Sequence, residues 1–289
     1  MDAITARRQP GSTLKPFLYA LALERGWTAA TIIDDSPLSE SVGSGLHTYR
    51  NYSRGHYGRV SLREALGNSL NIPAVRTLQY IGPGVFLNAL RDLGFDSLRA
   101  HPEVYGDGLA LGNGEVTLYE LVQAYTVLAR KGLFLPLTGR LGDPAARSER
   151  RVYSPEVSSL IADILADPQA RTLEFGDGGL LRFPVETAIK TGTSSVYRDA
   201  WAAGFNHRYT VGVWMGNLDR RSMDEVSGSV GAALVLRAIF AELNRRTQSQ
   251  SLYRSPRLVQ REICAEPEPP AAAPCWRRSE WFLPGTELE

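Results

Sequence analysis

The chain of 289 residues contains no long apolar run. A membrane-spanning helix needs about 20 consecutive apolar residues, and the best candidate, residues 232–243, is interrupted by Arg237 and Glu242. That stretch therefore predicts an amphipathic helix rather than a membrane span. The N-terminal residues MDAITARRQPGS are polar and carry two arginines, so we expect no secretory leader in this chain.

An excess of charge of one sign is also missing. Lysine and arginine number 32 and aspartate and glutamate 31, giving a formal net charge of +1. No strong field therefore attracts nucleic acid or anionic lipid, and we expect no nucleic-acid partner. Histidine is scarce, and none of the four has the spacing of a HExxH-type metal site: His47, His56, His101 and His207.

Cysteine is scarcer still, with Cys264 and Cys275 on either side of the stretch AEPEPPAAAP. Proline excludes both helix and regular strand pairing there, so the stretch is expected to be an open loop or linker. The residues alone leave two interpretations open. The cysteines are either free thiols or a local disulfide formed in an oxidising compartment.

The order of expected elements indicates an α+β fold, because helices come first, a hairpin-linked sheet follows and a helix closes the unit. Residues 34–59 are rich in Ser, Gly, Tyr and Asp and are interpreted as a long irregular loop, and residues 143–151 as a charged loop. The runs ETAIKTGTS, RDAWAAGFN and RYTVGVWMGN predict the strands. Periodicity and capping signals predict helices near residues 12–25, 61–67, 73–81, 85–93, 117–131, 154–167 and 231–246. We place one domain at residues 1–261, and a proline-rich linker with the stub of a further unit at residues 262–289.

The stretch GSTLK places Ser12 and Lys15 three residues apart at the expected start of a helix. Residues i and i+3 share a helix face, so the amine can approach the hydroxyl. A serine becomes a nucleophile when a base takes its proton, and a lysine is such a base when burial or charge keeps it neutral. Taken alone, this S-x-x-K pattern is more often an N-cap serine with a surface lysine.

Two further polar motifs follow. Ser69-Leu70-Asn71 lies at an expected helix break, where its polar residues either relay protons or serve as ordinary turn residues. Lys190-Thr191-Gly192-Thr193 ends an expected strand. Gly192 allows a ligand to approach the backbone closely, and the lysine and threonines can hold a carboxylate. The structural alternative for Lys190 is a charged residue that prevents an edge strand from pairing with another chain.

S-x-x-K, S-x-N and K-T-G in this order form the pattern of serine β-lactamases and penicillin-binding proteins. With its context (RQPGSTLKPF, NSLNIPAVR, LALGNGEVTLYELVQAY, AIKTGTS, DAWAAGF and YTVGVWMGN), the chain resembles the transpeptidase domain of class A, bifunctional penicillin-binding proteins. YTVGVWMGN and EWFLPGTELE are most similar to the 1C-type branch. The resemblance covers nearly the whole chain and implies the α+β transpeptidase fold, an antiparallel sheet with a helical lobe.

The resemblance implies a role for each motif residue. Ser12 attacks the carbonyl between the two terminal D-alanines of a peptidoglycan stem peptide and forms an acyl-enzyme, with Lys15 as base. Ser69 and Asn71 complete the proton-transfer and substrate network. An amine of a neighbouring stem peptide then resolves the ester and forms a cross-link, and a β-lactam would acylate the same serine.

The remaining motif residues are implied in binding. The backbone N–H groups of Ser12 and Thr193 form the oxyanion hole. Lys190, Thr191 and Thr193, beside Gly192, hold the terminal carboxylate of the substrate. No metal or organic cofactor is implied. The implied partners are stem peptides, β-lactam antibiotics and cell-wall synthesis complexes.

The resemblance also bears on compartment and chain ends. The family works on the periplasmic side of the bacterial inner membrane, which favours a Cys264–Cys275 disulfide, and in the 1C-type branch a small β domain follows residue 261. The family's fold has strands before the S-x-x-K helix, whereas this chain starts eleven residues before Ser12. We therefore expect a domain truncated at its N-terminus, without the family's upstream anchor and glycosyltransferase domain. The strand RYTVGVWMG should then have an unpaired apolar edge.

Two alternatives remain open. One is a β-lactamase or D,D-carboxypeptidase, in which water replaces the amine, and the other is a catalytically silent remnant or binding module that only presents the cleft. Fast hydrolysis by the class A β-lactamase route needs a positioned carboxylate. The glutamates between the second and third motifs show no ExxLN-like pattern, and the first two of them are interpreted as a cap and a surface residue: Glu115, Glu120, Glu149, Glu156, Glu174 and Glu186.

Overall fold

The computed structural model describes residues 2–42, 45–140, 149–176, 179–223, 226–265, 275 and 277–287. The α-helices are α1 (Lys15–Glu24), α2 (Leu62–Gly67), α3 (Asn71–Ile81), α4 (Pro83–Asp92), α5 (Pro102–Tyr105), α6 (Leu118–Ala129), α7 (Pro155–Ala166), α8 (Thr172–Phe175) and α9 (Ala232–Asn244). Short 3-10 helices are η1 (Gly11–Leu14), η2 (Gly106–Leu111), η3 (Gln169–Arg171) and η4 (Ser195–Tyr197). The strands are β1 (Ile32–Asp35), β2 (Leu38–Val42), β3 (Gly45–Tyr49), β4 (Gly58–Ser61), β5 (Leu133–Phe134), β6 (Arg150–Arg151), β7 (Ala188–Thr193), β8 (Asp199–Phe205), β9 (Thr210–Gly216), β10 (Val259–Cys264) and β11 (Arg277–Phe282).

Several helices begin where the sequence predicts, because their starts carry local capping signals. α2 follows Ser61, whose side chain forms a reciprocal capping box with Glu64. α6 follows Thr117 with the same arrangement to Glu120, and α7 follows the N-cap Ser154. The described helices include none that combines the length and apolarity needed to cross a bilayer.

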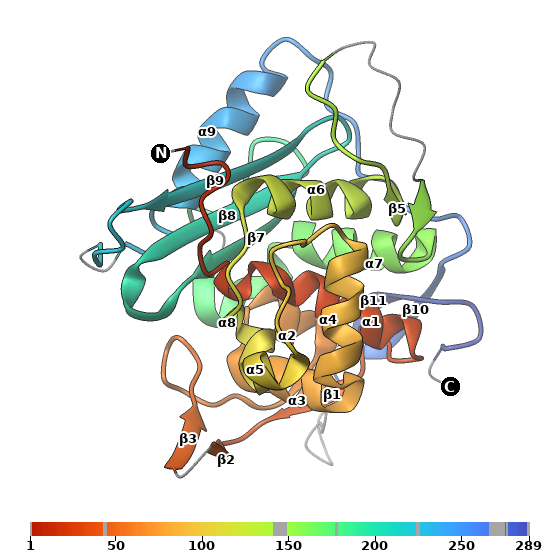
Figure 1. Ribbon diagram of the computed structural model, residues 1–289. Helices are drawn as coiled ribbons and strands as arrows, with labels where there is room; N and C mark the ends of the chain where they lie inside the picture. Colours follow the sequence, from red (N-terminus) through yellow and green to blue (C-terminus); the bar gives the residue numbers. More distant parts are fainter. Residues whose placement is uncertain are drawn as a thin grey trace.

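The strands β7, β8 and β9 form an antiparallel sheet, as predicted, and β8 turns tightly into β9 so that Phe205 faces Thr210. Trp201 and Ala203 of β8 belong to the main core, on the side of α6, whereas Ala202 between them packs with α9. The sheet therefore lies between α6 and α9 (Figure 1). Within the described residues β9 pairs with β8 alone, so its other edge carries no strand, as expected from the sequence.

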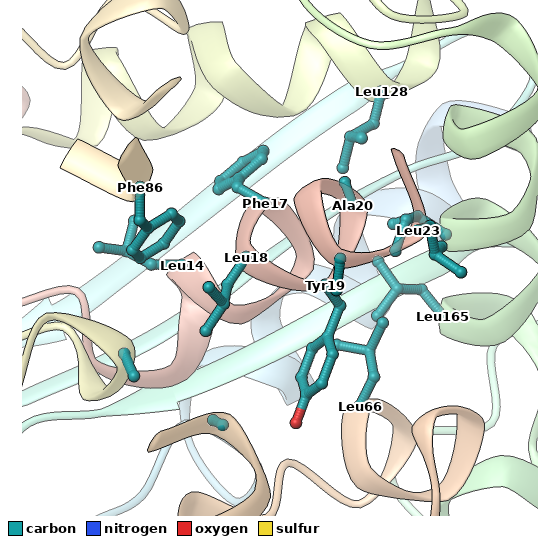
Figure 2. Close-up of a cluster of buried hydrophobic side chains, with 14 of the residues drawn as sticks. Leu14, Phe17, Leu18, Tyr19, Ala20, Leu23, Leu66, Phe86, Leu128 and Leu165 are labelled. Carbon is teal, nitrogen blue, oxygen red and sulfur yellow. The ribbon is translucent and has the colours of Figure 1, made fainter. Parts of the chain in front are cut away.

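Helix α1 runs through the centre of the main hydrophobic core. Its sequence is apolar on most faces, and accordingly nearly all of its residues are buried. Figure 2 shows Phe17, Leu18 and Leu23 of this helix among side chains from the surrounding elements. These neighbours come from α2, α4, α6 and α7: Leu66, Phe86, Leu128 and Leu165. The helix that follows Ser12 is thus held on several sides.

The interpretation of residues 34–59 as an irregular loop is wrong. β1 pairs with β4 in antiparallel fashion and β2 pairs with β3 as a hairpin. Ile33 and Val60 are register partners and are both buried. The turn-rich composition concealed these short strands, because each is only four or five residues long and the β1–β4 pair is joined across a long segment.

The C-terminal strands β10 and β11 pair in antiparallel fashion, and they pack on the helical lobe, where Arg63 of α2 donates to Glu280 of β11. Glu280 and Phe282 of β11 are fully buried, and a disulfide joins Cys264 to Cys275, whose Cα atoms lie 5.6 Å apart. The domain boundary expected after residue 261 falls inside β10. The proline-rich stretch that indicates a boundary begins only after this strand. Residues 266–274, which hold most of the proline-rich stretch of the expected linker, and residues 141–148, which include most of the expected charged loop, lie outside the described residues.

Candidate active site

The three polar motifs line one cleft between the helical lobe and the sheet. The cleft has a volume of about 990 Å³. The S-x-x-K turn contributes Ser12, the turn between α2 and α3 contributes Ser69 and Asn71, and β7 contributes Thr191 to Thr193. Residues more than 170 positions apart in the chain therefore meet at one site.

Two glycines allow the S-x-x-K turn and β7 to touch backbone to backbone. A Cβ atom at Gly192 would lie 2.4 Å from the carbonyl oxygen of Pro10, and one at Gly11 would lie 2.6 Å from that of Thr193. Gly11 also has a φ of +56°, which favours glycine. This contact places Ser12 beside the end of β7. The first N–H groups of a helix lack intrahelical partners, so η1 leaves the amide of Ser12 available to an oxyanion.

Lys15 is completely buried and points at the turn between α2 and α3. Its Nζ donates to the carbonyl oxygens of Ser69 (2.6 Å) and Leu70 (2.9 Å) and to Oδ1 of Asn71 (2.7 Å). Three acceptors occupy all three N–H groups of an ammonium. A neutral amine has one hydrogen fewer, so it releases one acceptor and gains a lone pair. The backbone N–H of Lys15 donates to the carbonyl oxygen of Ser12, but in the described residues no hydrogen bond joins Lys15 Nζ to the Ser12 hydroxyl.

The surroundings of Lys15 favour its neutral form. Burial lowers the pKa of Lys15 well below its usual value, and the charge of Lys190 acts in the same direction. The carboxylates of Glu174 and Asp35 act against this and raise the pKa of Lys15. Because burial dominates, Lys15 is suited to accept a proton.

Lys190 approaches the same turn from β7. Its Nζ donates to Oγ of Ser69 (2.6 Å) and to the carbonyl oxygen of Thr191 (2.9 Å). Burial, with a smaller contribution from the Arg171 guanidinium, lowers the pKa of Lys190 to about 7. Ser69 itself has a φ of +61°, a strained conformation for a residue other than glycine. The strained turn thus brings its hydroxyl to Lys190 and its carbonyl to Lys15.

Asp35 and Asn51, which sequence reasoning missed, connect to the site from behind. Nδ2 of Asn51 donates to both carboxylate oxygens of Asp35 (2.9 and 2.8 Å), and its Oδ1 accepts the backbone N–H of Asn71 (2.8 Å). Polar residues in a stretch rich in Ser, Gly and Asp look like ordinary turn chemistry. No local signal could therefore have identified them.

Glu174 is the second omission, since the sequence shows no motif around it. The structure places it in the wall of the cleft. Its Oε1 accepts hydrogen bonds from Ser53 Oγ (2.7 Å) and Tyr57 OH (3.2 Å), and its backbone N–H donates to Asn68 Oδ1 (2.9 Å). Helix α8, which carries it, is a single turn and leaves no periodic pattern to detect.

Comparison with known proteins gives a consistent result. The sequence pattern of the penicillin binding protein transpeptidase domain matches residues 1–240. Penicillin-binding protein 1C of Escherichia coli (strain K12) is 34% identical over an alignment of 294 positions, which covers 99% of this chain and 37% of that protein. Penicillin-binding protein 1A of Neisseria meningitidis serogroup A is 32% identical over 247 residues, covering 78% and 30%. The chain spans about a third of the length of these relatives.

Solved structures share the fold. The crystal structure of penicillin-binding protein 1A from Haemophilus influenzae superposes with a TM-score of 0.81 at 24% identity, covering 99% of this chain and 49% of that chain. PonA1 from Mycobacterium tuberculosis, solved in complex with penicillin V, gives a TM-score of 0.72 at 21% identity, with coverages of 88% and 73%. The α+β architecture predicted from the sequence is therefore confirmed.

Proposed function

The chain belongs to the penicillin-binding protein transpeptidase family, and from that premise we propose that it is a peptidoglycan D,D-transpeptidase domain with Ser12 as nucleophile. The observation that carries the proposal is the meeting of Ser12, Lys15 and Ser69 with the end of β7 in one cleft. The proposed substrates are stem peptides ending in D-Ala-D-Ala, and β-lactams are the proposed inhibitors. No cofactor is required.

Acylation begins with a neutral Lys15. Its lone pair takes the proton of Ser12, whose oxygen attacks the carbonyl between the two D-alanines. The N–H groups of Ser12 and Thr193 stabilise the oxyanion. As the peptide C–N bond breaks, the proton passes to the amine of the leaving D-alanine. The Ser69 hydroxyl, which Lys190 holds at 2.6 Å, is suited to relay it.

The terminal carboxylate of the donor is proposed to bind along β7. Thr193 Oγ1 accepts a hydrogen bond from the backbone N–H of Gly228 (3.0 Å). Its own O–H is therefore directed elsewhere and can donate to a carboxylate in the cleft. Thr191 lines the same wall, beside Gly192, and the charge of Lys190 adds attraction.

Transfer completes the cycle. Lys15 takes a proton from the nitrogen of an acceptor amine as that nitrogen forms a bond to the acyl carbon. The ester C–O bond to Ser12 then breaks, and Lys15 returns the proton to the Ser12 oxygen. We propose that this occurs on the periplasmic side of the inner membrane, in contact with cell-wall synthesis complexes. The disulfide between Cys264 and Cys275 suits an oxidising compartment.

Hydrolysis of the acyl-enzyme is a second candidate, as in a D,D-carboxypeptidase or a β-lactamase. The observation that favours it is the Glu174 carboxylate in the wall of the cleft, since a carboxylate can activate water as a general base. A Glu174→Gln variant separates the candidates. If water is the normal acceptor, the variant accumulates acyl-enzyme, whereas a transpeptidase accumulates it in both proteins until an amine is added.

The test of the proposal uses fluorescent penicillin and a tripeptide ending in D-Ala-D-Ala. We expect labelling of the native chain and none of Ser12→Ala, together with amide formation when an amine is supplied with the tripeptide. Equal labelling of both proteins would refute Ser12 as nucleophile. A folded native chain that takes no label would identify a catalytically silent remnant.

A further inference from the structure

We propose that Asp35 and Asn51 are positioning residues for the catalytic lysine, because they link a buried carboxylate through two side-chain amides to the Lys15 amine. This inference rests on the proposed function, since it assigns a task within acylation of Ser12. Asp35 is the last residue of β1 and Asn51 lies between β3 and β4, so both are outside the three sequence motifs.

The hydrogen bonds all run in one direction and are joined at Asn71, whose side chain takes one bond and whose backbone N–H makes the next. Lys15 Nζ donates to Oδ1 of Asn71 (2.7 Å), the backbone N–H of Asn71 donates to Oδ1 of Asn51 (2.8 Å), and Nδ2 of Asn51 donates to Asp35 (2.8 and 2.9 Å). Nδ2 of Asn71 donates to the carbonyl of Arg50 (2.7 Å). Each amide thus has donors on one side and acceptors on the other, so neither can flip without losing its partners.

The burial of Asp35 demands an explanation. Asp35 has no exposed surface, and Asn51 is 4% exposed. A buried carboxylate is costly unless it is hydrogen-bonded, and the donors to Asp35 among the described residues are both N–H groups, Asn51 Nδ2 and the backbone N–H of Tyr57 (2.8 Å). Within the described part of the chain, Asp35 thus has no lysine or arginine bonded to it, and neither Lys15 nor Lys190 is in direct contact with a carboxylate. Asp35 therefore places its negative charge behind the turn that receives Lys15.

The same carboxylate organises the wall of the cleft. Asn51 Nδ2 also contacts the carbonyl of Gly55 (3.0 Å), while Ser53 and Tyr57 donate their hydroxyls to Glu174. Residues 51–57 thus form a turn that is fixed to Asp35 on its inner side and to Glu174 on its cleft side. A purely structural role for Asp35 would be confined to closing this turn, so the test must separate the two roles.

The dependence of acylation on pH separates the positioning role of Asp35 from a purely structural one. The charged groups that act on Lys15 come from three elements: Lys190 of β7 lowers its pKa, and Glu174 of α8 and Asp35 of β1 raise it. Acylation requires neutral Lys15, so the acid limb of the acylation rate against pH follows the pKa of this lysine. Removing the charge of Asp35 should therefore move that limb to lower pH. Loss of a structural contact alone would lower the rate without moving the limb.

The experiment measures the second-order rate constant of acylation by fluorescent penicillin from pH 5 to 10, with thermal unfolding of each variant. Asp35→Asn should slow acylation by roughly 10- to 100-fold, the scale of a misplaced catalytic group, and shift the acid limb downward. The matched control is Asp34→Asn, the neighbouring exposed carboxylate that contacts Ser36 and Arg76. Its rate constant should stay within about twofold of the native value.

A double variant, Asp35→Asn with Asn51→Asp, keeps a donor and an acceptor between positions 35 and 51 and an acceptor for the Asn71 N–H, loses the donation to the Gly55 carbonyl, and moves the charge one step closer to Lys15. It should recover part of the lost rate and place the acid limb above that of Asp35→Asn. The proposal is overturned if folded Asp35→Asn has the native rate and profile, or if its rate falls equally at all pH values. Should Asp35→Asn fail to fold, a folded double variant with the native acid limb overturns it. Failure of the proposed function is recognised separately, because the native chain itself would then show no Ser12-dependent labelling.

Discussion

Substitution of Gly192 by alanine tests the backbone contact between β7 and the S-x-x-K turn. The added Cβ would lie 2.4 Å from the carbonyl oxygen of Pro10 and 2.8 Å from the methyl group of Thr13. An ordinary contact begins near 3.4 Å, so β7 and η1 must separate by about 1 Å. A displacement of that size at a reacting centre costs on the order of 100-fold in rate, and overpacking costs about 1–3 kcal/mol of stability.

The assay is acylation by fluorescent penicillin with urea unfolding of the same samples. We expect Gly192→Ala to fold and to lose about two orders of magnitude in acylation rate. Gly139→Ala is the matched control, since nothing lies within 4 Å of its added Cβ. Native acylation by Gly192→Ala would refute the inference that this contact sets the position of Ser12 relative to the end of β7.

Three further predictions follow from the buried charges and the disulfide. Because the pKa of Lys190 is lowered to about 7, the unfolded chain binds more protons above that value, so stability should rise between pH 7 and 10 with a contribution of up to about 1.4 kcal/mol per pH unit; Lys190→Met should reduce this slope in urea unfolding and leave the part that comes from Lys15, whose pKa is lowered too. Glu280→Gln should cost about 3 kcal/mol, because Arg63 donates Nε to the fully buried Glu280, whereas Glu262→Gln on the exposed face of the same hairpin should be nearly neutral. Reduction of the Cys264–Cys275 disulfide should lower stability by about 3 kcal/mol without changing the acylation rate, since neither cysteine lines the cleft.

The sequence predicted the features whose signals lie in residues that are neighbours along the chain. The starts of α2 and α7 were predictable because Ser61 and Ser154 cap the residues that directly follow them. The three motifs were predictable as one site because their residue types occur in a known order. The polar side chains of the three motifs could thus be named before their positions in the cleft were known.

The omissions have a common physical cause. β1 and β4 are stabilised by pairing with each other across more than twenty residues, which no local pattern records. Asp35 and Asn51 acquire their relation to Lys15 only through a chain of hydrogen bonds between distant segments. Glu174 reaches the cleft on a one-turn helix. Each depends on tertiary contacts rather than on its neighbours in the sequence.

Mapping of the penicillin adduct tests the central proposal most directly. The native chain is incubated with penicillin, digested, and the modified residue is identified by mass spectrometry of its peptide. We expect a single acyl group on Ser12, at an occupancy that falls when Lys15 is replaced by alanine. An adduct on another residue, or a folded chain that carries none, would contradict the assignment of Ser12 as the nucleophile of a D,D-transpeptidase.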